Sequence, residues 1–341
     1  MPHLTRRAAA TALSLGLGLA LMLPLALPAA AASEFLGQRT VRFSAAADYG
    51  RTPATTATLR LVDRVGGRFH LALGDLAYDD ATERQWCRYV TSIVGSRYPF
   101  QLLAGNHESA GRDGDIANFA RCLPNRLPGK TGRYSRQYYV DVPAANPVAR
   151  VIMISPGLRF GSATWRYQRG DARYRWTARA IDSARRAGIT WVVVGMHMPC
   201  LSMGRYGCSA GPDVMNLLVK KRVDLVLTGH EHIYQRSKQI TTGPGCRRVP
   251  TTRFDRDCVA SASSSLRAGR GSVFITAGTG GSTLRRVGLS DTQRGYFAAW
   301  SGRNVRPRHG IVSVDVTKQS LTARFVGSTA GTFTDQVTIR R

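Results

Sequence analysis

The chain has 341 residues, of which 43% are hydrophobic, a proportion ordinary for a globular protein. Lys and Arg number 48 against 21 Asp and Glu, which gives a formal net charge of +27 at neutral pH. No internal repeat, low-complexity linker or clear boundary divides the chain. Repeat architectures are therefore excluded, and we expect one large domain after the amino-terminal segment.

The amino terminus has the pattern of an export signal. The pair Arg6-Arg7 precedes an apolar run without charges over residues 8–27, and residues 30–32 offer a small-x-small cleavage site. The run is long enough to be a membrane anchor instead, but no basic stop-transfer flank follows it. We therefore predict a cleaved signal peptide over residues 1–32 and a catalytic domain over residues 33–341. The mature protein would be secreted, through Sec or twin-arginine export, and would have no membrane span.

Three strand-like segments come next, and each ends at polar side chains. Residues 39–46, 69–73 and 99–103 form these segments, with helix-like spacing over residues 53–65 and 81–94 between them. The segments lead to Asp48, to Asp75 and Tyr78, and to Asn106 and His107. Because open α/β sheets bind ligands at the carboxyl ends of their strands, this recurrence indicates a ligand site.

The middle of the chain repeats the pattern with histidines. We expect a short helix over residues 115–122, a loop over 123–136, paired strands over 137–142 and 149–155, and a rim loop over 156–172. Helices over 176–187 and 212–222 alternate with buried strands over 190–194 and 223–227. These two strands lead to His197 and to the pair His230 and His232.

The remainder has fewer signals. We expect a long stapled loop over residues 239–270, which together with the rim loop at 156–172 would set specificity. A strand over residues 272–277 runs into a glycine-rich turn at 278–281. A phosphate-cradling loop is the other interpretation of that turn, but its spacing matches no such loop and no helix clearly follows. Three alternating segments in the last 32 residues predict closing antiparallel strands.

All six cysteines lie after the predicted signal. Six cysteines allow about fifteen pairings, and nearness in sequence favours the set Cys200–Cys208, Cys246–Cys258 and Cys87–Cys122. A zinc cluster is excluded because no C-x2-C spacing occurs. Disulfides in an extracytoplasmic protein explain the even number better.

Arginine carries nearly all of the positive charge. The excess could attract an anionic substrate, nucleic acid or cell-wall polymer, or it could be a solvated arginine-rich surface. The arginines are spread along the chain, without a run of five or interleaved aromatic residues. We therefore expect some steering of anionic small molecules and no specific nucleic-acid partner. The oligomeric state is not indicated.

The polar residues at the strand ends make one candidate metal site. Its members are carboxylate, amide and phenol oxygens and imidazoles, donors that suit Fe, Mn and Zn: Asp48, Asp75, Tyr78, Asn106, His197, His230 and His232. Seven ligands with one shared carboxylate make two sites, and two adjacent cations can clamp the attacking and leaving oxygens of a phosphoryl displacement.

In these blocks the chain resembles the calcineurin-like metallophosphoesterases, and within them the purple acid phosphatases. The motifs are D-x-G at 48–50, G-D-x-x-Y at 74–78, G-N-H-E at 105–108, V-x-x-H at 194–197 and G-H-x-H at 229–232. The wider superfamily usually has D-x-H in the first block. Here Gly50 replaces that histidine and Tyr78 supplies a phenol, which is the purple-type arrangement.

The resemblance implies a role for each residue. Asp48, Tyr78 and His232 would hold a ferric ion. Asn106, His197 and His230 would hold a divalent Fe, Zn or Mn ion, and Asp75 would bridge the two. A hydroxide held by the metals would attack phosphorus in line, while His107 would stabilise the transition state or protonate the leaving oxygen. Tyr78 could instead be a core phenol beside a Zn or Mn site.

The resemblance also implies a four-layer α/β/β/α sandwich of two mixed sheets and hydrolysis of small phosphate monoesters. A phosphodiesterase or nucleotidase would use the same centre. A non-catalytic protein that binds anionic polymers is the alternative from another class, although no ligand is missing. Two residues depart from the family pattern: Ala47 replaces a usual glycine, and Gln235 replaces the glutamate of Tyr-Glu-Arg.

Overall fold

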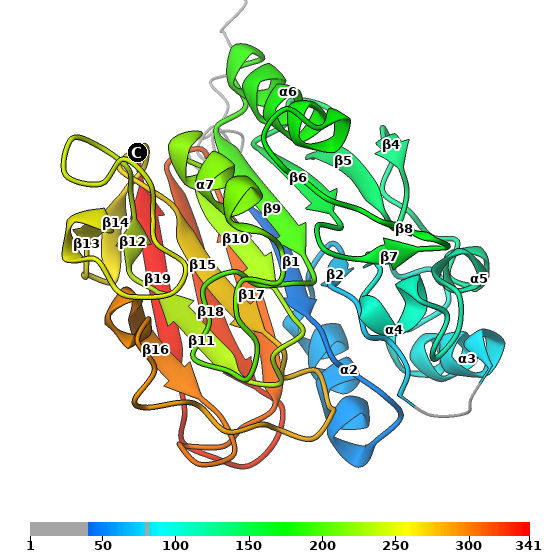
Figure 1. Cartoon of the computed structure of the whole chain (residues 1–341). Helices are drawn as coiled ribbons and strands as arrows, with labels where there is room; N and C mark the ends of the chain where they lie inside the picture. The colour runs from blue at the N-terminus through cyan, green and yellow to red at the C-terminus, as the bar shows by residue number, and fades with distance from the viewer. Residues whose placement is uncertain (1–39, 79–81) are drawn as a thin grey trace, which may run out of the picture. The chain divides into compact units, whose positions relative to one another are not determined.

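Two large mixed sheets packed face to face form the centre of the protein (Figure 1). The computed structural model describes residues 40–78 and 82–341, so the predicted signal peptide lies outside the described residues. The first sheet has seven strands, in the order β14 (Ser265–Arg267), β19 (Asp335–Arg340), β18 (Ser320–Gly327), β17 (Gly310–Val316), β1 (Val41–Ala46), β2 (His70–Ala72) and β3 (Phe100–Leu102).

The second sheet has eight strands. Their order is β16 (Phe297–Ser301), β11 (Tyr234–Ser237), β15 (Val273–Ala277), β10 (Leu225–Thr228), β9 (Trp191–Met196), β6 (Ala149–Ile154), β5 (Gln137–Val142) and β4 (Thr131–Arg133). Two small ladders lie outside the sheets: β7 (Arg159–Phe160) with β8 (Ala163–Thr164), and β12 (Gln239–Ile240) with β13 (Val259–Ser261).

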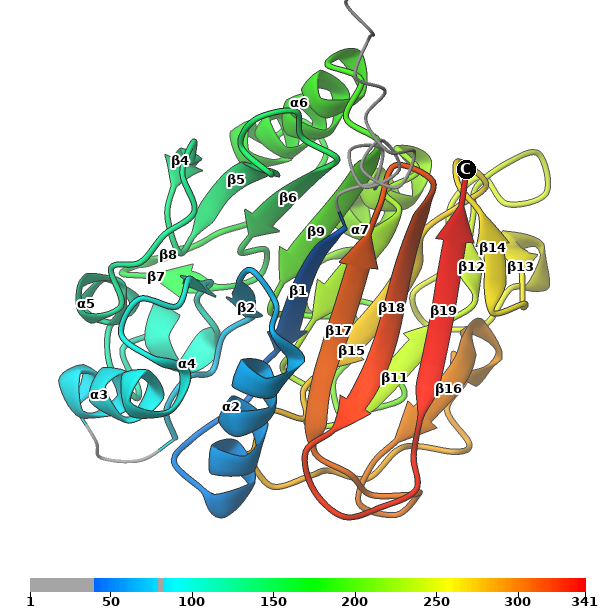
Figure 2. The ribbon, with the colours of Figure 1, turned by 180° about the vertical axis from the view of Figure 1, so that it is seen from behind.

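Helices pack on the outer faces of the two sheets (Figures 1 and 2), and in the first sheet they lie mainly over the side formed by β1, β2 and β3, whereas Figure 2 shows β18 and β19 without a helix in front of them. Those over the first sheet are α2 (Pro53–Val65), α3 (Glu83–Val94) and α5 (Ile116–Cys122). Those over the second sheet are α6 (Ala172–Arg186) and α7 (Pro212–Lys220). Single turns are α4 (Asn106–Ser109), η1 (Arg256–Cys258) and η2 (Arg294–Tyr296).

Three hydrophobic clusters separate these four layers. The first lies between the sheets and joins residues such as Val193 and Leu227 of the second sheet to Val312 and Val314 of the first. The second cluster lies under α6 and α7, and the third lies under α2, α3 and α5. A sheet that is apolar on both faces must be covered on both. The predicted α/β/β/α sandwich is therefore confirmed.

Local sequence signals place the helix ends. In α2, the Thr52 hydroxyl accepts a hydrogen bond from the backbone N–H of Thr55 at 3.0 Å, and Pro53 occupies the first turn. Gly66 ends the helix with a φ of 65°, which a residue with a Cβ adopts only with strain. The helix buries Leu59 and Val62, as its apolar spacing predicts.

The sequence pattern does not predict strands that are short or polar. The expected loops at 123–136, 156–172 and 239–270 contain β4, the β7–β8 ladder, and the strands β12, β13 and β14. The sequence does not predict strand β11, because Gln235 and Arg236 do not match an apolar alternation. Both are buried, and Arg236 reaches Asp335 across 99 residues of chain at 2.6 Å. Such a distant partner has no local signal in sequence.

Three disulfides connect the predicted pairs. Cys87–Cys122 joins α3 to α5, Cys200–Cys208 closes the segment after β9, and Cys246–Cys258 closes the segment before β13. The favoured connectivity among the possible pairings is thus confirmed. Within residues 40–78 and 82–341, none of the helices combines the length and apolar character needed to cross a bilayer.

Parallel pairing brings five strand ends to the same edge of the molecule. Strands β1, β2 and β3 are parallel neighbours in the first sheet, and β9 and β10 are parallel neighbours in the second. Their carboxyl ends carry the polar side chains singled out in the sequence. The candidate site therefore lies where the two sheets meet, and both sheets contribute to it.

Candidate metal centre

The backbone turns sharply at the strand ends that carry the candidate ligands. Asp48, Asp75 and His230 have φ angles of 63°, 52° and 69°, a left-handed conformation that is uncommon for residues other than glycine. Such strained residues persist only where the surrounding structure holds them, and they gather at functional sites. In each case the turn re-aims a side chain from the end of a strand toward the same point.

One group of contacts centres on the Tyr78 hydroxyl. Its oxygen lies 2.9 Å from Asp48 Oδ1, 2.9 Å from Asp75 Oδ2 and 3.1 Å from His232 Nε2. The imidazole of His232 is fixed from its other side, because its Nδ1 lies 3.0 Å from the carbonyl oxygen of Thr283. Four candidate ligands thus surround one point.

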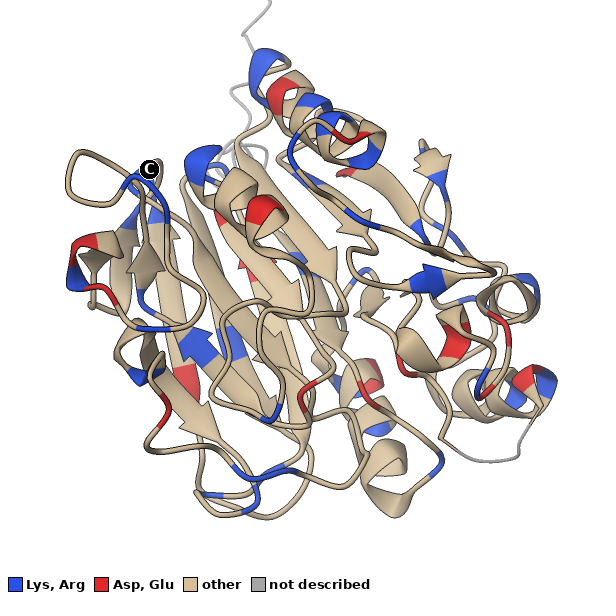
Figure 3. Ribbon diagram, in the orientation of Figure 1, with Lys and Arg blue, Asp and Glu red and all other residues tan. Residues whose placement is uncertain are grey.

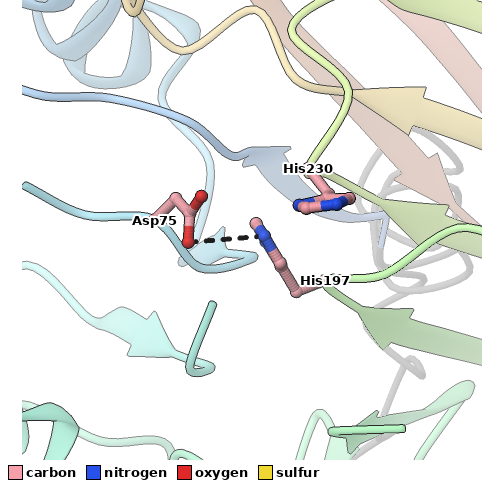
Figure 4. A group of neighbouring side chains, drawn as sticks. All are labelled: Asp75, His197 and His230. Carbon is pink, nitrogen blue, oxygen red and sulfur yellow. Dashed lines mark ion pairs between the residues drawn. The ribbon is translucent and has the colours of Figure 1, made fainter. Parts of the chain in front are cut away.

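A second group of contacts includes the other face of Asp75. His197 Nε2 lies 3.1 Å from Asn106 Oδ1 and 3.4 Å from Asp75 Oδ1, and the ring of His230 packs edge-on to that of His197 (Figure 4). Donor atoms of Asp75, His197 and His230 all lie within 4.8 Å of one another. His197 Nδ1 is held by the carbonyl of Leu73 at 2.8 Å. The two groups of contacts share Asp75.

His107 lies beside both groups without belonging to either. Its backbone N–H donates to Asp75 Oδ1 at 3.1 Å, and its Nε2 lies 3.6 Å from Asp75 Oδ2. Its Nδ1 is hydrogen-bonded to the carboxylate of Asp113, a residue that no sequence motif singled out. This contact orients the ring so that Nε2 faces the candidate centre, while the side chain keeps 15% exposure.

Glu108 holds two of the ligand-bearing turns together. Its carboxylate accepts hydrogen bonds from the backbone N–H groups of Asp75 at 3.1 Å, Leu76 at 2.5 Å and Gly105 at 2.9 Å. Glu108 is the last residue of the G-N-H-E motif. Its role is not visible there, because it depends on contacts with residues 32 and 33 positions earlier in the chain. Burial and the Asp75 charge raise the pKa of Glu108 to about 8, although these N–H groups lower it.

The electrostatics of the centre favour positive charge. Burial raises the pKa of Asp48. Burial also acts to raise the pKa of Asp75, but the charges of His197 and His107 outweigh it and the net shift is downward. Burial would lower the pKa of His197, yet the two carboxylates raise it to about 9. The carboxylates therefore draw a proton onto this buried imidazole, a role that bound cations can take over.

One buried carboxylate oxygen that lacks a hydrogen-bond partner in the described part of the chain indicates that these side chains could hold a metal ion. Asp48 Oδ2 is buried and has no hydrogen-bond partner among the described residues. A buried carboxylate oxygen without a partner is costly unless it binds a cation. The donor set around it contains carboxylate, amide and phenol oxygens and imidazole nitrogens, the mixture that Fe, Mn and Zn accept. The side chains therefore fit a metal centre.

Residues outside the motifs form a wall next to the two histidines of the G-H-x-H motif. The ring of Tyr206 stacks on that of His230 with centroids 4.4 Å apart, and its backbone N–H donates to Glu231 Oε1 at 2.5 Å. Arg285 Nη1 lies 3.2 Å from the carbonyl oxygen of His230 and 4.0 Å from Glu231 Oε2. Glu231 is fully buried. Its position between two candidate ligands is the sequence signal for these neighbours, because a buried carboxylate needs hydrogen-bonding or charged partners.

The glycine-rich turn after β15 lets two strand ends approach each other. A Cβ on Gly278 would lie 1.9 Å from the carbonyl oxygen of Glu231 and 2.7 Å from Asp48 Oδ2. Gly280 donates its N–H to the carbonyl of Ala47 at 2.9 Å. The turn is therefore a close contact between the sheets beside the candidate ligands, in line with the tight-turn interpretation.

The part of the chain that carries the candidate ligands matches a known protein family. The family model described as calcineurin-like phosphoesterase matches residues 47–234, more than half of the chain and the whole span from Asp48 to His232. The chain belongs to the calcineurin-like phosphoesterase family. The resemblance inferred from the motifs is thereby confirmed for that family.

Within the family, the similar proteins include purple acid phosphatases. Purple acid phosphatase 18 of Arabidopsis thaliana is 28% identical over 214 residues, which cover 60% of this chain and 47% of that protein. The purple acid phosphatase of Glycine max is 25% identical over 190 residues, covering 51% and 39%. The chain thus spans about half the length of the curated relatives it matches.

Solved structures show the same fold. The purple acid phosphatase PPD1 from yellow lupin seeds superposes with a TM-score of 0.66 at 17% identity, covering 89% of this chain and 54% of that one. A dimetal phosphatase from Danio rerio superposes with a TM-score of 0.50 at 13% identity, covering 89% and 99%. Two packed sheets with helices on both outer faces are therefore common to this family member and these enzymes.

Proposed function

We propose that the protein hydrolyses phosphate monoesters at a centre of two metal ions held at the edge where the two sheets meet. The observation that carries the proposal is the convergence of seven donor side chains from five strand ends into two groups of contacts that share Asp75. Two cations held there would polarise the phosphoryl oxygens and activate the attacking water.

The protein's own residues would divide the work around these ions. Tyr78, with Asp48 and His232, would hold the first ion, which we propose to be ferric iron. Asn106 and the remaining two histidines of the set would hold a divalent Fe, Zn or Mn ion, and the shared carboxylate would bridge the pair.

His107 is the residue that we assign to proton transfer. Asp113 orients its ring through Nδ1, so Nε2 is the atom directed at the candidate centre. From there it can donate a proton to the oxygen of the leaving group or stabilise negative charge on the phosphoryl group as the bond breaks. The 15% exposure of the side chain leaves it a path to solvent for taking up the next proton.

The first experiment is metal analysis of the purified protein together with its visible absorption and hydrolysis of an aryl phosphate. We expect about two metal ions per chain and a broad visible band that disappears in Tyr78→Phe. Tyr89→Phe is a matched control, because its half-buried hydroxyl bonds Thr56 2.7 Å away in the helix layer. Colourless, active protein with two Zn or Mn ions would overturn the iron assignment, and metal-free, inactive protein after reloading would overturn the proposal.

We further infer that the mature protein acts outside the cytoplasm after removal of residues 1–32. Three disulfides support this location, since such bonds persist in oxidising compartments. Amino-terminal sequencing of protein recovered from the culture medium tests the inference. A terminus at Ser33 is expected, whereas recovery only from the cytoplasm with residues 1–32 intact would contradict it.

A further inference from the structure

A cavity of about 1020 Å³ opens directly beside the candidate metal centre. His232 forms part of its wall, and the rest comes from the segments around residues 204–205, 282–290 and 303–304. The arginine side of this cavity consists of Arg205, Arg285, Arg286 and Arg303, and we call it the arginine groove. Neither segment that the sequence suggested for specificity, 156–172 or 239–270, contributes a lining residue.

Backbone contacts tie the arginine groove to a candidate metal ligand. Arg285 donates its backbone N–H to the carbonyl oxygen of His232 at 2.9 Å, and Arg303 donates its own to the carbonyl oxygen of Arg285 at 2.8 Å. The Thr283 carbonyl contacts the imidazole of the same histidine. The arginines are therefore held at a fixed place next to the centre, although their side chains lie at the surface.

The positive charge of the groove is mostly uncompensated. Within the described part of the chain, the side chains of Arg205, Arg286 and Arg303 have no carboxylate at ion-pair distance, and all three are exposed. Arg285 alone approaches an acidic group, Glu231, at 4.0 Å. Figure 3 shows positively charged segments on the loops at the lower edge of the molecule, where Figure 1 places the orange segment after β15.

From this arrangement we infer that the groove binds further phosphate groups on the leaving-group side of the substrate. The inference rests on the proposed function and names its substrate class: phosphate compounds whose leaving group is itself phosphorylated, such as a nucleoside triphosphate or an inorganic polyphosphate chain. Guanidinium groups pair with phosphate through two parallel hydrogen bonds. One phosphate would be held at the metals, and the cavity is far larger than a second phosphate requires.

The lining of the cavity also contains apolar side chains, and these would contact a nucleoside but not an inorganic phosphate chain. Leu284 and Val287 are buried there, and Leu289 is the exposed large hydrophobic side chain of the described residues, at 43% exposure. A nucleoside could pack on this side chain, whereas an inorganic chain would leave it in water. The variant Leu289→Ser therefore separates the two sources.

The test compares kcat/KM for phenyl phosphate, inorganic triphosphate and a nucleoside triphosphate. We expect the ratio of either triphosphate to phenyl phosphate to fall about threefold in Arg286→Ala, and about tenfold when Arg303→Ala is added. The matched control is Arg186→Ala, an exposed arginine at the end of α6 that leads to the amino end of β9, away from the ligands. Its ratio should stay at the wild-type value.

Three results would refute the proposal that the groove binds further phosphate groups. They are a ratio unchanged in the double variant, an equal fall in the Arg186→Ala control, or a wild-type preference for phenyl phosphate over both triphosphates. Hydrolysis of phenyl phosphate with an unchanged ratio would refute the groove and leave the proposed function intact. With Leu289→Ser, a fall of about threefold for the nucleoside triphosphate alone identifies the nucleotide as the source, and no change identifies the inorganic chain.

A binding measurement makes the inference independent of activity. Imidotriphosphate, which resists hydrolysis, should bind the purified protein at least about fivefold more weakly in the double variant, with a salt dependence that is reduced as well. If this difference appears while no phosphate ester is hydrolysed, the groove stands and the proposed function fails. Equal binding by wild type and double variant would refute the groove whatever the activity.

Discussion

Replacement of Glu108 by Ala should destabilise the protein severely even without metal. Its carboxylate is 1% exposed and accepts three backbone hydrogen bonds, from two turns that carry candidate ligands. Each buried N–H left without a partner costs about 1–3 kcal/mol. With partial entry of water, we expect a loss of about 5 kcal/mol in the free energy of unfolding, a large part of the roughly 5–15 kcal/mol of a typical domain.

Glu108→Gln should be milder, because its amide oxygen can still accept from Asp75 and Gly105. Its amide nitrogen would then face the N–H of Leu76, and one unsatisfied donor pair costs about 1–3 kcal/mol. Glu83→Ala is the matched control. Glu83 accepts from the Asp115 N–H at 2.9 Å, but it is only half-buried, so water can replace it and the loss should be about 1 kcal/mol or less.

Urea unfolding followed by tryptophan fluorescence in the presence of a chelator measures all three variants. The chelator removes any contribution of metal binding, so the differences report the hydrogen bonds alone. The expected order of loss is Glu108→Ala, then Glu108→Gln, then Glu83→Ala. If Glu108→Ala costs no more than the control, the carboxylate does not support these turns and our account of the centre's backbone is wrong.

Three further predictions concern the close turn, the metals and a disulfide. Gly278→Ala should lower metal affinity at least about tenfold by displacing the neighbouring carboxylate and carbonyl, as measured by competition with a chelator. Gly243→Ala, with open space at its Cβ and no left-handed backbone, should not. Removal of the metal ions by a chelator should lower the calorimetric unfolding midpoint reversibly, since each ion at 100 times its Kd contributes about 2.7 kcal/mol to the free energy of unfolding. An unchanged midpoint after proven metal loss would contradict this prediction. Cys87→Ser with Cys122→Ser should cost about 4 kcal/mol in urea unfolding, because the bond closes a separation of 35 residues; a cost below about 1 kcal/mol would show that the loop is already constrained in the unfolded chain.

The sequence predicts the location of the candidate site best where a polar side chain follows a predicted strand. Asp48, Asp75 and His197 each follow an apolar run, and the structure brings all three to one edge because those runs form parallel strands. Parallel pairing follows from the alternation of strands with helices. Their convergence was therefore predictable from the pattern, while their roles as metal ligands remain predictions.

The features that the sequence does not predict depend on contacts between residues far apart in the chain. Strand β11 has no sequence signal because Arg236 is charged, and its burial depends on the ion pair with Asp335 from the last strand. Arg286 and Arg303 belong to no motif, and they line one cavity because backbone hydrogen bonds join their segments to each other and to His232. The segments 156–172 and 239–270, for which the sequence suggests a role in specificity, do not line this cavity, and their role stays a prediction.

The candidate ligands come from both sheets, so neither sheet alone can hold the centre. Asp48, Asp75 and Asn106 follow strands of the first sheet, whereas His197 and His230 follow strands of the second. A folding intermediate with a single formed sheet would have at most four of the seven donors. Metal uptake during refolding would therefore report the docking of the two layers, and a bound ion would act as a cross-link that slows their separation.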